Sequence, residues 1–204
     1  MYTLYTMYTT TVTAIFYKAF QREMPKNRIR NGTKKMSQKL KTSIIGIVTV
    51  IVLLIFDQLT KYMAVLQLKD AAPFVLFKDV FELKYLENHG AAFGVLQNQR
   101  FLLLLITIVI LGVLCFLYSR IPVKKRYFPL RAAGILLAAG AVGNMIDRFI
   151  NGYVVDFFYF KWIDFPIFNV ADCYVVVAAV LAFFLVCFYY KDEDFDFLKK
   201  DKKS

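Results

Sequence analysis

Four apolar segments, each close to the length that crosses a bilayer, constrain this chain more than any other feature of its sequence. They cover residues 43–66, 101–118, 130–150 and 173–190. A helix of about 20 mainly apolar residues spans the hydrocarbon core of a membrane. The whole chain is 59% hydrophobic over 204 residues, which is far more apolar than a soluble domain. The sequence therefore predicts an all-α integral membrane protein with four transmembrane helices and little room for a second domain.

The third segment, residues 130–150, is rich in small side chains. Examples are Ala138, Ala139, Gly140, Ala141 and Gly143. Small residues let neighbouring helices approach each other closely in a membrane. We therefore expect this helix at the centre of the bundle.

Basic residues are distributed unevenly between the connections. Residues 1–42 carry nine Lys or Arg against one acid, and residues 120–131 carry five basic residues and no acid. The connections 64–100 and 149–172 together carry five basic residues against seven acids. The positive-inside rule then predicts that both termini and the 120–131 connection are cytoplasmic. The net charge of +11 indicates contact with membrane lipids rather than nucleic acid, for which the sequence has no binding motif.

The first 35 residues differ in kind from the rest. A Tyr- and Thr-rich stretch is followed by a basic segment, without the order of residues that marks a signal peptide. We expect an atypical extension, either disordered or the product of a mis-assigned start with Met36 as the true one; an amphipathic surface anchor is the alternative. Residues 36–190 then form the four-span domain, and residues 191–204 form a charged cytoplasmic tail.

Two aspartates, Asp156 and Asp172, stand at the edges of apolar segments on the same predicted face. Carboxylates near a bilayer are costly and usually functional, and two that share a proton can activate a water, as in aspartic proteases. Residues 153–160 are aromatic and β-branched, which predicts a small extended, β-like element that carries Asp156. The non-catalytic alternatives are an exposed loop acid for Asp156 and a helix N-cap for Asp172. An N-cap position would not prevent Asp172 from being catalytic as well. The pattern favours a catalytic pair.

Further polar residues lie near the same predicted ends of the spans. Asp57 and Lys61 are four residues apart on a helix, so we expect a structural ion pair or a contact with headgroups. Asn144, Asp147 and Arg148 lie within about one helical turn. We expect them to support the loops that carry the active site, with substrate contact by Asn144 or Arg148 as the alternative.

Residues 87–94 combine polar and small side chains, which suits an irregular segment or a turn. His89 is the only histidine, and we expect an ordinary loop residue because two carboxylates already supply an acid and a base. The three cysteines lie in apolar runs without metal-type spacing, so we expect small buried hydrophobes. The sequence predicts no metal and no cofactor.

Five short motifs, in this order, resemble those of the bacterial lipoprotein signal peptidases, also called type II or prolipoprotein signal peptidases. The resemblance covers nearly all of residues 36–190. The motifs are Asp57-Gln-x-x-Lys61, Asn88-x-Gly-Ala-Ala-Phe-Gly94, Gly143-Asn144-x-Ile-Asp147-Arg148, Gly152-x-Val-Val-Asp156-Phe157 and Phe168-Asn169-x-Ala-Asp172. The chain departs from the family pattern at Cys173 and Tyr174, where small polar residues are common, and in the extension before Met36.

The resemblance implies an aspartic endopeptidase of the bacterial cell membrane with Asp156 and Asp172 as its catalytic dyad. It implies that Asn88, Asn144, Arg148 and Asn169 line or support the site. The implied substrate is a prolipoprotein whose lipobox cysteine already bears diacylglycerol, cut just before that cysteine. A site at the outer membrane face agrees, because the lipid can stay in the bilayer while the peptide bond reaches water. We expect the enzyme to act as a monomer.

Two other classes of membrane protein would also place acids near a bilayer. A transporter or channel needs polar residues along a path, but the second and fourth segments carry no charge. A non-catalytic scaffold would explain the small residues of the third segment, but not two aspartates in these motifs. Retained function after Asp156→Asn would favour either class over the peptidase.

Overall fold

The computed structural model describes residues 26–91 and 95–198, with side chains from residue 37 onward. Most of the predicted N-terminal extension lies outside the described residues, and so do residues 92–94 of the second motif. The chain divides into two units, one up to Ile44 and one from Ile45 onward. Everything described below as a site lies within the second unit.

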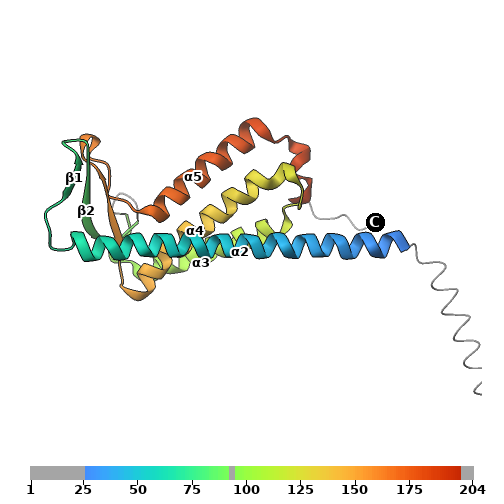
Figure 1. Cartoon of the computed structure of the whole chain (residues 1–204), viewed down its shortest axis with the longest axis horizontal. Helices are drawn as coiled ribbons and strands as arrows, with labels where there is room; N and C mark the ends of the chain where they lie inside the picture. The colour runs from blue at the N-terminus through green and yellow to red at the C-terminus, as the bar shows by residue number, and fades with distance from the viewer. Residues whose placement is uncertain (1–25, 92–94, 199–204) are drawn as a thin grey trace, which may run out of the picture. The chain divides into compact units, whose positions relative to one another are not determined.

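Within the described part of the chain, four helices are long and apolar enough to cross a membrane, which confirms the predicted four-helix architecture. They are α2 (Lys26–Leu68), α3 (Arg100–Arg120), α4 (Phe128–Ile150) and α5 (Val170–Phe184) (Figure 1). Short turns extend two of them: η2 (Lys125–Tyr127) leads into α4, and the π-helical turn η4 (Leu185–Tyr189) continues α5. Because α5 begins at Val170, the fourth span starts three residues before the apolar run 173–190 that the sequence predicted.

The outward faces of these helices are apolar and uncovered by protein. Phe101, Leu105 and Ile108 of α3 are all exposed. Such a surface suits lipid, which is as apolar as these side chains. Cys115 and Cys187 are exposed as well, and Cys173 is half-buried. The prediction that all three cysteines are buried is therefore wrong, because these helices bury little of their surface against one another.

The small residues of α4 allow close contacts on two sides. A Cβ added to Gly143 would lie 2.6 Å from Oδ2 of Asp57 on α2. A Cβ added to Gly140 would lie 2.5 Å from the backbone oxygen of Ala171 on α5. Helix α4 also packs against α3. The third span thus contacts all three others, which agrees with its predicted central position.

A three-stranded antiparallel sheet lies at the end of the bundle where α2 and α4 end and α5 begins (Figure 1). Its strands, in spatial order, are β1 (Phe74–Phe77), β2 (Phe81–Asn88) and β3 (Val154–Phe160). The predicted extended segment around Asp156 is confirmed as β3. The expectation of an irregular segment from residue 87 onward is wrong for Glu87 and Asn88, because both pair in register with β3.

A small apolar core joins this sheet to the helices. It contains Ala64 and Leu68 from α2, Val155 and Phe157 from β3, and Val170 from α5. Burial of these side chains fixes β3 against the start of α5. The core therefore sets the position of the two elements that carry Asp156 and Asp172.

Candidate active site

Backbone pairing brings the start of α5 next to β3. The N–H groups of Phe157 and Phe158 both donate to the carbonyl oxygen of Phe168, at 3.0 and 2.8 Å. Asn169 follows immediately and so lies beside Asp156. The side chain of Asp156 is 1% exposed. It is therefore not the exposed loop acid that the sequence allowed as an alternative.

Asp172 lies in the first turn of α5, where it shares a capping box with Asn169. The side-chain oxygen of Asn169 accepts a hydrogen bond from the Asp172 N–H at 3.0 Å. In return, Oδ2 of Asp172 accepts from the Asn169 N–H at 3.1 Å. The N-cap is therefore Asn169, so the alternative of Asp172 as the N-cap residue is wrong, although the Asp172 carboxylate takes part in the cap as the N3 residue. Helix α5 starts at Val170, before Asp172, because the extended segment that pairs with β3 ends at Asn169.

Asn169 joins the two aspartates, which we call the aspartate pair. Its Nδ2 donates to Oδ1 of Asp156 at 2.6 Å, while its backbone and Oδ1 hold Asp172. The side chain is fully buried. One residue thus donates to a carboxylate on a strand through its side-chain amide and to a carboxylate on a helix through its backbone N–H.

Two more asparagines bond the remaining carboxylate oxygens. Nδ2 of Asn88 donates to Oδ2 of Asp156 at 2.9 Å. Nδ2 of Asn144 donates to Oδ1 of Asp172 at 2.8 Å. Each of the four carboxylate oxygens of the aspartate pair therefore accepts one hydrogen bond. These bonds fix the orientation of both side chains.

Burial first, and then the charge of Asp172, raise the pKa of Asp156 from its ordinary 3.8 to about 7. The hydrogen bonds from Asn88 and Asn169 oppose this rise, with a smaller effect. Two neighbouring carboxylates cannot both ionise cheaply, so the pair titrates as a unit and keeps one proton up to near-neutral pH. Asp172 is half-buried and is the more open of the two.

A buried ion-pair cluster, formed by Asp57, Lys61 and Asp147, lies next to the aspartate pair. Nζ of Lys61 is 3.0 Å from Oδ2 of Asp57 and 3.0 Å from Oδ2 of Asp147. All three side chains are at most 4% exposed. The predicted pairing of Asp57 with Lys61 is thus present, but the pair is enclosed by protein and has no surface to contact headgroups.

The two acids of this cluster hold the backbone just before each member of the aspartate pair. Oδ1 of Asp57 accepts from the N–H of Ala171 at 2.9 Å, and Ala171 precedes Asp172. Oδ2 of Asp147 accepts from the N–H of Val155 at 3.2 Å, and Val155 precedes Asp156. The cluster therefore sets the spacing between β3 and α5.

Gln58 is a site residue that the sequence reasoning missed. Its Nε2 donates to Oδ1 of Asp147 at 3.0 Å and to Oδ2 of Asp57 at 3.2 Å. The available signal was its place inside the first motif, next to Asp57 in an otherwise apolar span.

Arg148 does not join the ion-pair cluster. Its Nη2 donates to the carbonyl oxygen of Gly90 at 2.8 Å. It supports the loop after β2 and does not pair with Asp147.

Two further possibilities from the sequence are His89 as a base and a bound metal ion. His89 packs its ring against Tyr153 at a centroid distance of 5.4 Å. Among residues 26–91 and 95–198, no three His, Cys, Asp or Glu side chains are grouped so that they could hold a metal ion. The polar groups that the structure brings together here are two carboxylates and the asparagine amides that orient them.

Comparisons with known proteins point to one family. The family model described as signal peptidase (SPase) II matches residues 49–188. A lipoprotein signal peptidase of Caldanaerobacter subterraneus subsp. tengcongensis is 41% identical over 144 residues, which cover 70% of this chain and 96% of the relative. One of Streptococcus pyogenes serotype M1 is 35% identical over 151 residues, with coverages of 73% and 95%. A bacterial membrane enzyme solved by the in meso method at 2.3 Å resolution superposes with a TM-score of 0.63 at 31% identity, over 78% of this chain and 94% of that one.

Proposed function

The chain belongs to the signal peptidase II family, and we propose that it removes signal peptides from diacylglyceryl-modified prolipoproteins by an aspartic mechanism. Family membership makes it a multi-pass protease of the bacterial membrane that processes lipoproteins. The observation that carries the mechanism is the connection of Asp156 and Asp172 through Asn169. The cut falls just before the lipid-bearing cysteine.

In the proposed reaction the aspartate pair starts with one proton. Asp156 carries it, because burial raises its pKa to about 7, and the more open Asp172 is ionised. Asp172 takes a proton from a water molecule, whose oxygen attacks the scissile carbonyl carbon. At the same time Asp156 donates its proton to the carbonyl oxygen. Asp172 then gives its proton to the leaving nitrogen, a hydroxyl proton of the intermediate returns to Asp156, and the C–N bond breaks.

The other site residues act as positioning groups in this proposal. Asn88, Asn144 and Asn169 hold the carboxylate oxygens. Lys61 donates to Oδ1 of Asn144 at 2.9 Å, which fixes the amide so that its nitrogen faces Asp172. Arg148 holds the loop after β2. Such orientation lets the two carboxylates meet substrate and water without rearrangement at the moment of reaction.

We further propose that the aspartate pair lies at the outer face, with both termini in the cytoplasm. The basic 120–131 segment ends in the first turn of α4, whereas Asn144 and Asp147 lie near the opposite end of that helix. The positive-inside rule then assigns the two ends to opposite sides. Lys78→Cys, in the turn between β1 and β2, should react with a membrane-impermeant maleimide on intact spheroplasts. Lys125→Cys should react only after lysis; the reverse pattern would contradict this topology.

We propose that the enzyme acts as a monomer, because residues of one copy already bond all four carboxylate oxygens of the aspartate pair. The scissile peptide bond of a substrate would then meet both carboxylates of a single copy. Mixing inactive Asp156→Asn with inactive Asp172→Asn tests this point. Recovery of cleavage in the mixture would require residues from two copies and would contradict the monomer.

The main experiment is cleavage of a diacylglyceryl-modified prolipoprotein by purified protein in detergent. Asp156→Asn and Asp172→Asn should each lower the rate by roughly 10²–10⁴-fold or more, since each removes one proton-transfer group. The matched control is Asp79→Asn, whose side chain is 72% exposed in the β1–β2 turn and which should cut at the normal rate. A substrate with serine in place of the lipobox cysteine carries no lipid and should not be cut.

The outcomes separate the alternatives. A folded variant with near-normal activity would show that its aspartate is structural. Loss of activity with a chelator would contradict a reaction without metal. A wild-type protein that never cuts any lipid-modified substrate would favour a transporter or a non-catalytic scaffold over the peptidase.

A further inference from the structure

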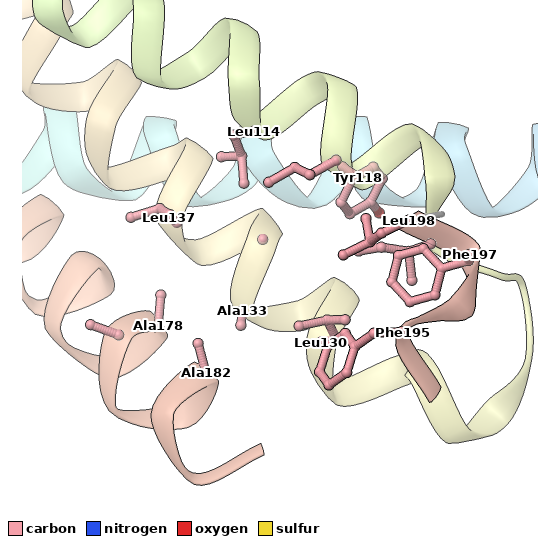
Figure 2. Close-up of a pocket in the computed structure, with 14 residues that line it drawn as sticks. Leu114, Tyr118, Leu130, Ala133, Leu137, Ala178, Ala182, Phe195, Phe197 and Leu198 are labelled. Carbon is pink, nitrogen blue, oxygen red and sulfur yellow. The ribbon is translucent and has the colours of Figure 1, made fainter. Parts of the chain in front are cut away.

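Figure 2 shows an apolar cavity of about 270 Å³. Its lining residues on α3 and α4 lie toward the end of the bundle opposite the aspartate pair. Its walls come from α3, α4, α5 and the C-terminal turn η5 (Asp192–Leu198). They include Leu114, Leu137, Ala178, Ala182, Phe195 and Phe197. Apart from the phenol of Tyr118, every side chain that lines the cavity is a hydrocarbon or glycine. The cavity therefore offers burial and almost no hydrogen bonding.

This composition selects an apolar occupant over water. A buried water needs two to four polar partners, and a cavity lined by Leu and Phe stays dry or takes up an apolar molecule. The wall also contains Leu117, Ala179 and Leu198, which are exposed on the outside of the protein. The cavity thus opens on the surface of membrane-spanning helices. The apolar groups available at such an opening are the acyl chains of lipids.

The connection between α3 and α4 gives this end of the cavity a positive charge. Ile121 and Leu130 both line the cavity, and the exposed cations Arg120, Lys124 and Lys125 lie next to or between them. Among the side chains that the structure describes, none of these three forms an ion pair with a carboxylate. Arg120 also lies 4.8 Å from the centre of the Phe116 ring, but no carboxylate neutralises any of these three charges in the part of the chain that the structure describes.

The other two cations of this connection are already occupied. Arg126 pairs with Asp194 of η5. Arg131 is buried, donates to the carbonyl oxygen of Ile121 at 3.0 Å and lies 4.4 Å from the centre of the Tyr118 ring. The same interactions hold η5 and the end of α3 in place as walls. The charge without a carboxylate partner is thus limited to three exposed groups that adjoin the lining residues Ile121 and Leu130 along the chain.

We propose that this cavity binds an acyl chain of an anionic phospholipid whose phosphate rests on Arg120, Lys124 and Lys125. Basic pockets between transmembrane helices recognise anionic headgroups in this way. The apolar wall supplies burial of the chain, and the three cations supply preference for a negative headgroup. The site is separate from the aspartate pair, so the proposal does not rest on the proposed peptidase activity.

The test uses the full chain in nanodiscs made from an equal mixture of phosphatidylethanolamine and phosphatidylglycerol. Native mass spectrometry after release reports which lipid stays bound. The wild type should retain one phosphatidylglycerol. Ala182→Phe should lose it, because the new ring fills the cavity. Val180→Phe makes the same kind of change on the same helix at a residue that is 51% exposed, and it should keep the lipid.

A second pair of variants tests the headgroup. Lys124→Gln combined with Lys125→Gln should keep a bound lipid but lose the preference for phosphatidylglycerol. Lys39→Gln combined with Lys41→Gln removes two exposed cations from α2 and should leave the preference unchanged. If Ala182→Phe fails to fold, Ala182→Leu fills less of the cavity and serves instead.

Each other result overturns part of the proposal. A wild type without retained lipid, or full retention by the folded cavity-filling variant, would exclude the cavity as a lipid site. Equal retention of both lipids by the wild type would exclude the role of the three cations.

Discussion

Nζ of Lys61 lies 2.9 Å from Oδ1 of Asn144, and the other end of the same amide donates to Asp172 at 2.8 Å. The side-chain amide of Asn144 therefore links the buried ammonium group of Lys61 to the aspartate pair. The same ammonium group pairs with Asp57 and Asp147, which accept from the backbone N–H groups of Ala171 in α5 and Val155 in β3. The ion-pair cluster and the aspartate pair thus form one connected polar unit inside an apolar bundle.

The rate of prolipoprotein cleavage should fall as the pH rises through about 7. Burial and the charge of Asp172 raise the pKa of Asp156 to about 7, so above that pH the pair loses its last proton and its general acid. The measurement is kcat/KM against pH with the purified enzyme. Asp79→Asn should give the same profile. An unchanged rate well into the alkaline range would show that no shared proton is needed.

The stability of Asp156→Asn relative to wild type should increase with pH between about 4 and 7. A carboxyl whose folded pKa is raised to about 7 stabilises the fold fully below its unfolded pKa, and this contribution disappears as the pH rises to the folded value. Asparagine does not ionise, so the variant escapes this loss. The shift from 3.8 to about 7 sets an upper limit of about 4 kcal/mol.

Thermal unfolding in detergent at a series of pH values measures this difference. Asp79→Asn is the control, because its exposed side chain should leave the curve of the wild type unchanged. A constant difference between Asp156→Asn and wild type at all pH values would mean that Asp156 titrates normally in the folded protein.

Lys61→Met should destabilise the protein by roughly 3–5 kcal/mol, because it leaves the buried carboxylates Asp57 and Asp147 without their cation. Cleavage activity should fall with it, since Asn144 loses the contact that orients it. Lys69→Met is the matched control: its pair with Glu87 is 42% and 33% exposed. The unfolding temperature and activity of this control should stay near those of wild type. Similar small changes in both variants would argue against a structural role for the cluster.

Gly143→Ala should disrupt the site, although alanine favours helix more than glycine does. The new Cβ would lie 2.6 Å from Oδ2 of Asp57 and 3.3 Å from the Cβ of Ala171. Either the Asp57 carboxylate must leave its bonds to Lys61 and to the Ala171 N–H, or α2 or α5 must move. Gly112→Ala is the control, with no atom within 4 Å of its Cβ, and it should be neutral or stabilising by about 0.5–1 kcal/mol. Unfolding temperature and cleavage rate distinguish them. Equal tolerance of both changes would exclude the close helix contact.

Several features could be predicted because they depend on neighbouring residues. The four helices follow from apolar runs of membrane length, and β3 follows from its β-branched and aromatic composition. The central place of α4 follows from its small side chains. The spacing of Asp57 and Lys61 was enough to predict their contact, because residues four apart meet on a helix. Each of these predictions uses only distances along the chain that local geometry sets.

The remaining contacts join residues that are distant in the sequence. Asp57 bonds the backbone of Ala171 across 114 positions, and Gln58 reaches Asp147 across 89. Asn169, rather than Asp172, caps α5 because the backbone before it pairs with β3.

The sequence by itself thus determined the membrane architecture and which polar residues stand near one end of it. Only the tertiary structure decided which of those residues bond to one another. The physical reason is that a buried polar group must find a partner, and the packed bundle alone determines which partners are within reach.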